Sequence, residues 1–415
     1  MKCQELPIKP KLLEQLHDQG FTNLTTIQEK CIPHILNGHD VIGQAETGSG
    51  KTLAFCLPIL DALHTHCGLQ ALILTPTREL CVQVADVFKE YGKSLHLTVA
   101  CIHGGVNINP QISRLKNAEI AVATPGRTLD HIHRGTIDLR RIQILVIDET
   151  DKMFEMGFIE DVEAIMRETP TERQLLLFSA TVSDDVLTLI QHHTRQEPTV
   201  IRTQSYVDHT KLHQIYYDIY EQNQKFSLLV HLLRTRSEGL SIVFCGTRRE
   251  SDVVARNLKT QGIYASAIHG GMNQNKRMIS LNDLKNERTK VLVATDVAAR
   301  GLDIKNITHI YNYDVPKTPT DYIHRIGRTA RAGAQGAAIT LLTERDHENF
   351  RRVQSNEALQ IERMDLPEFR RVPFVRPASS HHHQGNSRGS TRNQQHRPHR
   401  NSSPHRESFG RSFHH

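Results

Sequence analysis

Short, uninterrupted apolar runs alternate with amphipathic stretches along most of this chain. The runs in its first half occupy residues 71–74, 120–123, 144–147 and 175–178. Continuous apolarity is typical of strands that are buried on both faces of a parallel sheet. The stretches between the runs carry apolar residues at helical spacing, as from Leu80 to Tyr91 before Gly92. The pattern therefore predicts an α/β fold in which a mostly parallel sheet is covered by helices.

A faint internal repeat indicates that this unit occurs twice. Three matches recur in the same order, at offsets of 170, 166 and 171 residues: Thr77-Arg78 with Thr247-Arg248, Ile102 to Gly105 with Ile268 to Gly271, and Val122 to Thr124 with Val293 to Thr295. The second copy has strand candidates at 241–244 and 291–294, and a helix that Thr247 and Glu250 cap and that ends near Gly262. We expect one domain over residues 1–205 and a second over 206–366.

Composition and charge narrow the class of protein. The chain has 415 residues, of which 38% are hydrophobic and 23% charged, as in soluble globular proteins. It contains neither an apolar run near the ~20 residues that span a bilayer nor a signal-peptide core, and its seven cysteines are scattered. These features predict reduced, buried thiols, no membrane contact, and a cytoplasmic protein.

The excess positive charge lies at the C-terminal end. The periodic apolar pattern stops after about residue 366, and residues 376–415 contain seven arginines but only one acidic residue, which accounts for the whole net charge of +6. Such a polar segment has little to bury. We expect a disordered basic tail over residues 367–415 whose arginines neutralise the phosphates of a polyanion, with an inert tail as the alternative.

The sequence A-E-T-G-S-G-K-T at residues 45–52 fits the phosphate-loop pattern, except that Ala45 replaces the first glycine. It follows a short apolar run at Val41-Ile42 and precedes a helical pattern. Backbone N–H groups of such a loop bind phosphate oxygens, the lysine reaches the β/γ-phosphates, and the last hydroxyl holds Mg²⁺. The pattern predicts that ATP and Mg²⁺ are the cofactors and that the nucleotide is bound by Thr47, Gly48, Ser49, Gly50, Lys51 and Thr52.

Two further clusters carry candidate chemistry. Asp148 and Glu149 follow the run at 144–147, where a carboxylate holds Mg²⁺ and its neighbour orients the attacking water; an acidic helix cap is the alternative. Arg325, Arg328 and Arg331 lie three residues apart in the copy that lacks G-K-[ST]. They could form a solvated basic face or reach across to the γ-phosphate that the first domain holds.

These residues belong to a longer series of motifs through which residues 3–350 resemble the DEAD-box RNA helicases. The series is Phe21 to Gln28, A-E-T-G-S-G-K-T, P-T-R-E-L (76–80), Gly104-Gly105, T-P-G-R (124–127), D-E-T-D (148–151), S-A-T (179–181), Q-x-x-R (274–277), A-T-D-V-A-A-R-G-L-D (294–303) and H-R-I-G-R-T-A-R (324–331).

The resemblance implies two tandem RecA-like domains and a role for each motif residue. Phe21 would stack on adenine and Gln28 would hydrogen-bond its edge, although Thr25 and Gln28 also fit a helix capping box. Asp303 would contact the ribose, Glu149 would be the catalytic base, and His324, Arg328 and Arg331 would complete the catalytic set. Ser179 and Thr181 would couple hydrolysis to domain closure. The RNA backbone would be bound by Arg78, Gly105, Thr124 and Arg127 in one domain and by Thr247, Arg277, Thr295 and Arg300 in the other.

Four positions depart from the family pattern. Cys3 and Leu24 replace a phenylalanine and a proline, which predicts a looser adenine side. Thr150 replaces the alanine of D-E-A-D, and Ala330 stands where many members have glycine. If that position needs a positive φ, alanine costs about 1 kcal/mol there.

The motifs leave the mode of action open. An RNA unwinder and an ATP-gated RNA clamp need the same residues, whereas a DNA-translocating helicase is disfavoured by the Phe21 and Gln28 pair and by H-R-I-G-R-T-A-R. We expect a monomer that binds RNA without sequence preference. The sequence does not name the RNA, the pathway or any protein partner.

Overall fold

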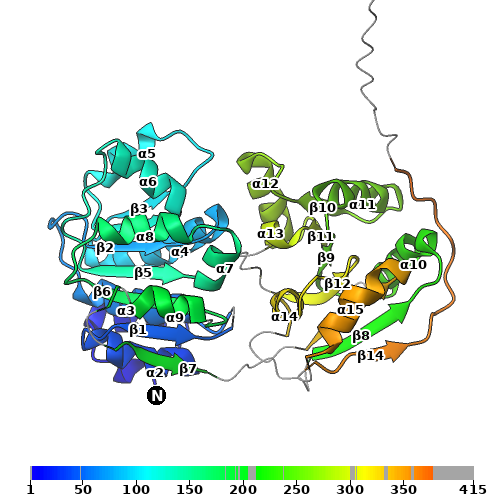
Figure 1. Cartoon of the computed structure of the whole chain (residues 1–415), viewed down its shortest axis with the longest axis horizontal. Helices are drawn as coiled ribbons and strands as arrows, with labels where there is room; N and C mark the ends of the chain where they lie inside the picture. Colours follow the sequence, from blue (N-terminus) through cyan, green and yellow to red (C-terminus); the bar gives the residue numbers. More distant parts are fainter. Residues whose placement is uncertain are drawn as a thin grey trace, which may run out of the picture. The chain divides into compact units, whose positions relative to one another are not determined.

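The computed structural model describes residues 2–46, 48–182, 184–191, 193–194, 197–203, 212–236, 238–299, 304, 306–330, 335–356 and 359–376. Its strands form two seven-stranded sheets. We call residues 2–203 the first lobe and residues 212–376 the second lobe. In each lobe the sheet lies between layers of helices (Figure 1).

The first lobe contains a fully parallel sheet in the order β3-β4-β2-β5-β6-β1-β7. Its strands are β1 (Val41–Gln44), β2 (Ala71–Leu74), β3 (Val99–Ile102), β4 (Ile120–Ala123), β5 (Ile144–Asp148), β6 (Gln174–Ser179) and β7 (Thr199–Arg202). Its α-helices are α1 (Pro10–Asp18), α2 (Thr26–Leu36), α3 (Lys51–Ala62), α4 (Arg78–Gly92), α5 (Asn109–Leu115), α6 (Pro125–His133), α7 (Thr150–Glu155), α8 (Ile159–Arg167) and α9 (Asp184–Gln191), with 3₁₀ turns η1 (Cys3–Glu5) and η2 (Lys93–Leu95).

The second lobe repeats this sheet in the order β10-β11-β9-β12-β13-β8-β14, again with parallel neighbours. Its strands are β8 (Leu212–Asp218), β9 (Leu240–Phe244), β10 (Ala265–Ile268), β11 (Val291–Ala294), β12 (Ile307–Asn312), β13 (Gly336–Leu342) and β14 (Glu362–Met364). Its helices are α10 (Gln222–Thr235), α11 (Arg248–Thr260), α12 (Gln274–Lys285), α13 (Asp296–Ala299), α14 (Pro319–Ile326), α15 (His347–Gln354) and the 3₁₀ turn η4 (Glu344–Asp346).

The predicted repeat is confirmed, because the two sheets have the same strand order with β1 to β7 replaced by β8 to β14. Thr77 and Thr247 cap equivalent helices, α4 and α11, and each hydroxyl accepts a hydrogen bond from the third residue of its helix. The predicted helix after Thr247 ends at Thr260, and Gly262 follows with φ +76°. The RecA-like fold class expected from the sequence is the observed one.

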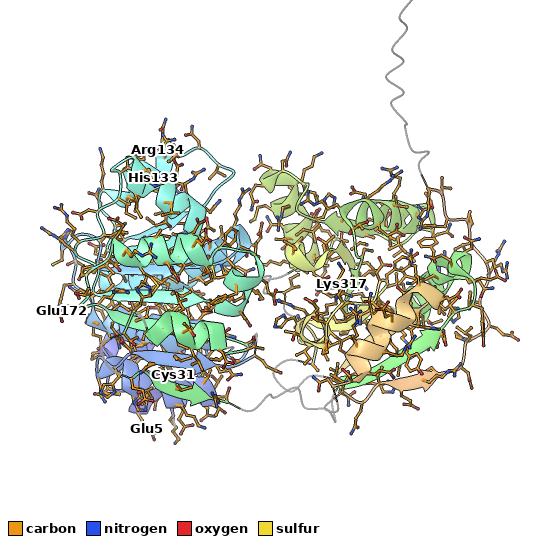
Figure 2. All side chains as sticks on the ribbon, viewed as in Figure 1. Glu5, Cys31, His133, Arg134, Glu172 and Lys317 are labelled. Atoms are coloured by element: carbon orange, nitrogen blue, oxygen red, sulfur yellow. The ribbon has the colours of Figure 1, made fainter. Side chains whose placement is uncertain are left out.

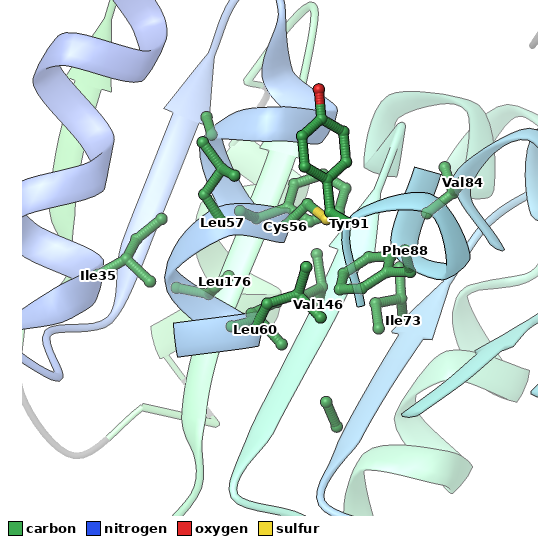
Figure 3. Close-up of a cluster of buried hydrophobic side chains, with 14 of the residues drawn as sticks. Ile35, Cys56, Leu57, Leu60, Ile73, Val84, Phe88, Tyr91, Val146 and Leu176 are labelled. Atoms are coloured by element: carbon green, nitrogen blue, oxygen red, sulfur yellow. The ribbon is translucent and has the colours of Figure 1, made fainter. Parts of the chain in front are cut away.

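The continuous apolar strands contribute side chains to hydrophobic cores on both faces of each sheet, as their pattern predicts. In β5, Ile144 and Val146 pack with α1 to α4, whereas Leu145 and Ile147 pack with α7 and α8. Figure 3 shows the first of these cores, where Phe88 of α4 lies among side chains of α3 and the sheet. Because both faces of each central strand are buried, the packing of the sheet determines where each strand ends.

The predicted start of the tail at residue 367 is wrong. Phe369, Val372 and Phe374 pack against the core that α10 and α11 form on the second sheet. The segment has no regular secondary structure and is tied down by the backbone N–H of Val372, which donates to Ser227 Oγ (3.0 Å), and by that of Val375, which donates to Asn257 Oδ1 (2.8 Å). Side chains, and not a neighbouring strand or a helical turn, accept the hydrogen bonds of this backbone. The sequence of the segment therefore has neither helical nor strand periodicity. Residues 377–415 lie outside the described residues.

The cysteines differ partly from the expectation of buried thiols. All seven are free, but Cys67 is exposed and Cys101 is only partly buried. Cys31 of α2 is fully enclosed, in contrast to His133 and Arg134 at the end of α6, which are exposed at the surface of the first lobe (Figure 2). Cys3 is also buried in the first lobe's core, so replacement of the family's phenylalanine leaves this segment packed. Among the described residues, no helix combines the length and the apolarity that crossing a membrane requires.

Candidate nucleotide and RNA site

The order of the strands brings the motifs that are predicted to bind the nucleotide together at one part of the carboxyl edge of the first sheet. The phosphate loop follows β1, Asp148 ends β5, and Ser179 ends β6, and these strands are neighbours in the order β5-β6-β1. In the strand register Gln44 pairs with Ser179 and Asp148 pairs with Phe178, so the three strands end at nearly the same level. Ligands of open parallel sheets bind at this edge.

The phosphate loop has the backbone that its glycines predict. Gly48 and Gly50 have φ values of +86° and +92°, and Gly50 is the N-cap of α3. Lys51 is buried and its ammonium group folds over the loop, donating to the carbonyls of Ala45 (2.5 Å) and Glu46 (3.0 Å). Ala45 is tolerated because, unlike the two glycines, it does not need a positive φ. Ser49 donates to the Glu46 carbonyl (2.8 Å), Thr52 lies in the first turn of α3, and Thr47 lies outside the described residues.

Gln28 connects the N-terminal helices to this loop. Its Oε1 accepts from the Thr25 backbone N–H (2.9 Å), which confirms the capping box, and its Nε2 donates to the Gly50 carbonyl (3.0 Å). A Cβ at Gly50 would lie 2.5 Å from this Nε2, so the contact requires glycine. Phe21 is 41% exposed, which is unusual for a large apolar side chain and leaves its ring accessible for stacking.

Asp148 and Glu149 form a buried acidic pair at the end of β5. Burial, aided by the charge of Glu149, raises the pKa of Asp148 to about 7. Burial also acts to raise the pKa of Glu149, but the charges of Lys152 and Arg328 outweigh it and the pKa lies below its usual value. Glu149 has φ +52°, a left-handed backbone that turns the chain sharply from β5 into α7. Thr150 fits without an unpaired hydroxyl, because its Oγ1 donates to the Ile147 carbonyl (3.2 Å).

Asp151 is a functional candidate for which no role was predicted from the sequence. Its Oδ2 accepts from the backbone N–H groups of Ala180 (3.2 Å) and Thr181 (3.1 Å) and from Thr181 Oγ1 (3.3 Å). Its own N–H donates to Ser179 Oγ (3.1 Å). The same Oδ2 lies 4.0 Å from Nε2 of His324 in the second lobe. The S-A-T segment therefore holds the carboxylate that meets the other lobe.

The three arginines of H-R-I-G-R-T-A-R do not act alike. Arg325 is committed within the second lobe: Nε and Nη2 bind the two oxygens of Asp296 (2.5 and 2.8 Å), and Nη1 donates to Asn312 Oδ1 (3.1 Å). It is therefore structural, contrary to the view of all three as one basic set. Arg328 is buried, and its charge acts on Glu149 of the first lobe. Arg331 lies outside the described residues.

The residues of the first lobe that are predicted to contact RNA follow the strands β2, β3 and β4 at the same edge of the sheet. The Arg78 guanidinium lies against Gly104 and Gly105, where a Cβ on Gly105 would overlap it. Arg127 donates to the Val106 carbonyl through both Nη atoms (3.2 and 3.3 Å). Thr124 is the N-cap of α6. These contacts bring Arg78, Gly105 and Arg127 together beside one loop.

The second lobe repeats this arrangement after β9, β10 and β11. Arg248 lies against Gly270 and Gly271 as Arg78 lies against Gly104 and Gly105. Thr247 is exposed at the start of α11, and Thr295 is buried just before α13. Sequence reasoning missed Arg248, although the 170-residue offset already pairs it with Arg78. Arg300 and Asp303 lie outside the described residues.

An ion pair between a partly buried arginine and a buried glutamate joins the two lobes beside these loops. Arg277 Nη2 lies 3.1 Å from Glu79 Oε2, and Gln274 Nε2 donates to Glu79 Oε1 (3.1 Å). Glu79 stands next to Arg78 on α4 and is 4% exposed. Arg277, predicted to contact RNA, thus has a carboxylate partner on the other lobe. Glu79 itself was missed, because nothing in its local sequence indicates a partner 195 residues away.

Fold and site together define a two-lobed nucleotide-binding protein of the phosphate-loop class. A family model described as DEAD/DEAH box helicase matches residues 25–189, and one described as Helicase conserved C-terminal domain matches residues 224–333. DEAD-box ATP-dependent RNA helicase CshA of Bacillus cereus is 42% identical over 366 residues, which cover 88% of this chain and 70% of that protein. ATP-dependent RNA helicase CshA of Listeria monocytogenes is 43% identical over 368 residues, covering 88% and 71%. This chain belongs to the DEAD-box ATP-dependent RNA helicase family.

Solved structures agree with this assignment. Dbp5 of S. cerevisiae bound to RNA and ADP BeF3 superposes with a TM-score of 0.80 at 32% identity, covering 88% of this chain and 95% of that one. A DEAD box protein from the hyperthermophile Methanococcus jannaschii is 38% identical with a TM-score of 0.53, covering 88% and 99%.

Proposed function

We propose that this protein is an ATP-dependent RNA helicase whose hydrolytic site is completed when the two lobes meet. The observation that carries the proposal is the approach of second-lobe groups to the acidic end of β5. His324 lies 4.0 Å from Asp151, and the charge of Arg328 acts on Glu149. Cations supplied from one lobe to phosphates held by the other stabilise the transferring phosphoryl group. Hydrolysis would then depend on whatever brings the lobes together.

The proposed roles follow from the positions of the side chains. Lys51 and the N-terminus of α3 bind the phosphates, and Phe21 and Gln28 contact the adenine. Asp148 and Thr52 supply the hard oxygen ligands that Mg²⁺ prefers, and the bound ion would neutralise charge on the phosphates. Glu149 accepts a proton from the water that attacks the γ-phosphorus, so that ATP and water become ADP and inorganic phosphate. Arg328 stabilises the developing charge. Asp303 and Arg331 keep the roles that the family resemblance implies.

RNA is the proposed activator of this closure. Arg78, Gly105, Thr124 and Arg127 on the first lobe and Thr247, Thr295 and Arg300 on the second would contact RNA phosphates and sugars, to which we add Arg248. Such contacts are blind to base sequence. Arg277 would act chiefly through its pair with Glu79, so that RNA bound along both lobes favours the state in which this pair forms. Dbp5, a structural relative, was solved with RNA and ADP BeF3 bound.

Two finer points belong to the same proposal. Both halves of the hydrolytic site come from one chain, which supports action as a monomer. All seven cysteines are described and free, which suits the reducing cytoplasm, where we propose that the protein acts.

The test is the ATPase rate of the full chain without nucleic acid and with single-stranded RNA, duplex RNA or DNA, alongside an unwinding assay. We expect stimulation by RNA and not by DNA, together with strand separation of short duplexes. RNA stimulation without unwinding would indicate an ATP-gated clamp, and a rate that RNA does not change would contradict the proposal.

A further inference from the structure

Lys152 is a buried cation to which neither the motifs nor the proposed mechanism gives a role. It lies in the first turn of α7, one residue beyond D-E-T-D, and its side chain is only 2% exposed. Its Nζ lies 2.6 Å from Oε1 of Glu149. Lysine is rarely buried to this extent without a specific partner, because its charge loses hydration. Here the partner is the proposed catalytic base.

The two oxygens of Glu149 have different surroundings. Oε1 is held by Lys152, whereas Oε2 is buried and has no hydrogen-bond partner among the residues that the structure describes. A buried carboxylate oxygen without a partner is unfavourable unless a ligand or water meets it. The backbone is also constrained: Glu149 has φ +52°, and its carbonyl accepts from the N–H groups of Lys152 (3.0 Å) and Met153 (3.2 Å). One oxygen is therefore anchored and the other is available for the attacking water.

We propose that Lys152 is a positioning residue, which clamps the Glu149 carboxylate by Oε1 and so directs Oε2 toward the attacking water. The inference rests on the proposed role of Glu149 as the base. A carboxylate on a flexible side chain loses rate when it can rotate away from its water, because general-base catalysis requires hydrogen-bond geometry. The salt bridge between Lys152 and Glu149 removes that freedom.

A double-mutant cycle on the full-length protein tests this, with kcat and KM for ATP measured at saturating RNA. Lys152→Met should lower kcat by roughly 10-fold, as loss of an orienting partner commonly does, with KM changed by less than about threefold. Lys152→Arg, which keeps the charge and the reach, should recover most of the rate. In a Glu149→Gln background, Lys152→Met should change kcat by less than about twofold, because the group on which it acts is already disabled. Lys89→Met on the exposed face of α4 is the matched control and should leave kcat unchanged.

Each outcome either supports or contradicts the proposed positioning role of Lys152. An equal loss from Lys152→Met in both backgrounds, or an increased rate without RNA, would show that Lys152 does not position Glu149 for catalysis. If Glu149→Gln itself hydrolyses ATP at a near-normal rate, the proposed base is wrong, and the cycle reports that separately. Thermal unfolding identifies a variant that fails to fold; Lys152→Gln, which is polar but uncharged, then takes the place of the methionine variant in the same cycle.

Discussion

Ala330 shows how one residue can conflict with the backbone that the fold imposes on it. Its φ is +54°, which is the condition under which the sequence predicted a cost for alanine at this position. The left-handed region is unfavourable for any residue with a Cβ and is readily adopted by glycine. Ala330, the seventh residue of the arginine motif, packs in the second lobe's core, so the surrounding structure holds it there.

Ala330→Gly should therefore raise the free energy of unfolding by about 1 kcal/mol, after allowance for the greater freedom of glycine in the unfolded chain. Urea unfolding of the full chain, followed by circular dichroism, measures the change. Ala255→Gly within α11 is the control and should lower stability by about 1 kcal/mol, because its backbone is helical. Destabilisation by both substitutions would show that the strain at Ala330 is relieved in some other way.

Single residues also mark the limit of what the sequence could predict. Gly50, Lys51, Asp148 and Glu149 could be named as candidates because a phosphate loop and a strand-end carboxylate have local signatures. Lys152 and Glu79 were missed, since the role of each depends on where a side chain points and on which partner it meets. Arg325 illustrates the opposite error, in which spacing grouped a structural arginine with Arg328, for which we propose a catalytic role.

Among the elements, several fully buried central strands were predictable from their apolar runs. Strands β2, β4 and β11 were predicted with their observed bounds, because all four residues of each are buried. The strands β3 and β7, at the two edges of the first sheet, were missed. So was β13 of the second sheet, which is almost entirely buried, so burial alone does not separate the predicted strands from the missed ones. The repeat was the stronger signal, since three weak matches at nearly constant offset predicted the shared strand order.

The repeat makes a prediction about α11. Arg248→Ala should weaken RNA binding similarly for every RNA sequence and reduce the slope of log K against log salt by about 0.7, the value for one lost single-strand phosphate contact. Arg256→Ala, farther along the same helix and also exposed, is the control and should change neither quantity. Filter binding or fluorescence anisotropy at several salt concentrations gives both values. An Arg248 variant with unchanged affinity would restrict the RNA contacts of this loop to Thr247.

For the molecule as a whole, the described second lobe extends to residue 376, and most of the net positive charge of the chain lies beyond that residue. Arg376 Nη2 lies 3.2 Å from Glu250, near the N-terminus of α11 and its Thr247, and the remaining basic excess lies in residues 377–415. We therefore expect the tail to add electrostatic affinity for RNA, whereas the segment 367–376 stabilises the second lobe.

Two truncations distinguish these roles. Deleting residues 377–415 should weaken RNA binding and reduce the slope of log K against log salt by a few units, at about 0.7 per lost phosphate contact. The saturating ATPase rate should change little. Deleting residues 367–415 should also destabilise the protein by at least about 2 kcal/mol, because Phe369, Val372 and Phe374 no longer cover the core. Equal thermal stability of the two truncated proteins would contradict the assigned role of residues 367–376, and an unchanged salt slope would leave the tail inert.

The central claim is that the second lobe supplies chemistry to a nucleotide held by the first. The most direct test is the RNA-stimulated ATPase rate of Arg328→Ala, with Arg351→Ala on the exposed face of α15 as the control. If Arg328 stabilises the transferring phosphoryl group, turnover should fall by about 10³ while nucleotide affinity stays within several-fold of the wild type. Near-normal turnover by Arg328→Ala would show that the first lobe hydrolyses ATP without it.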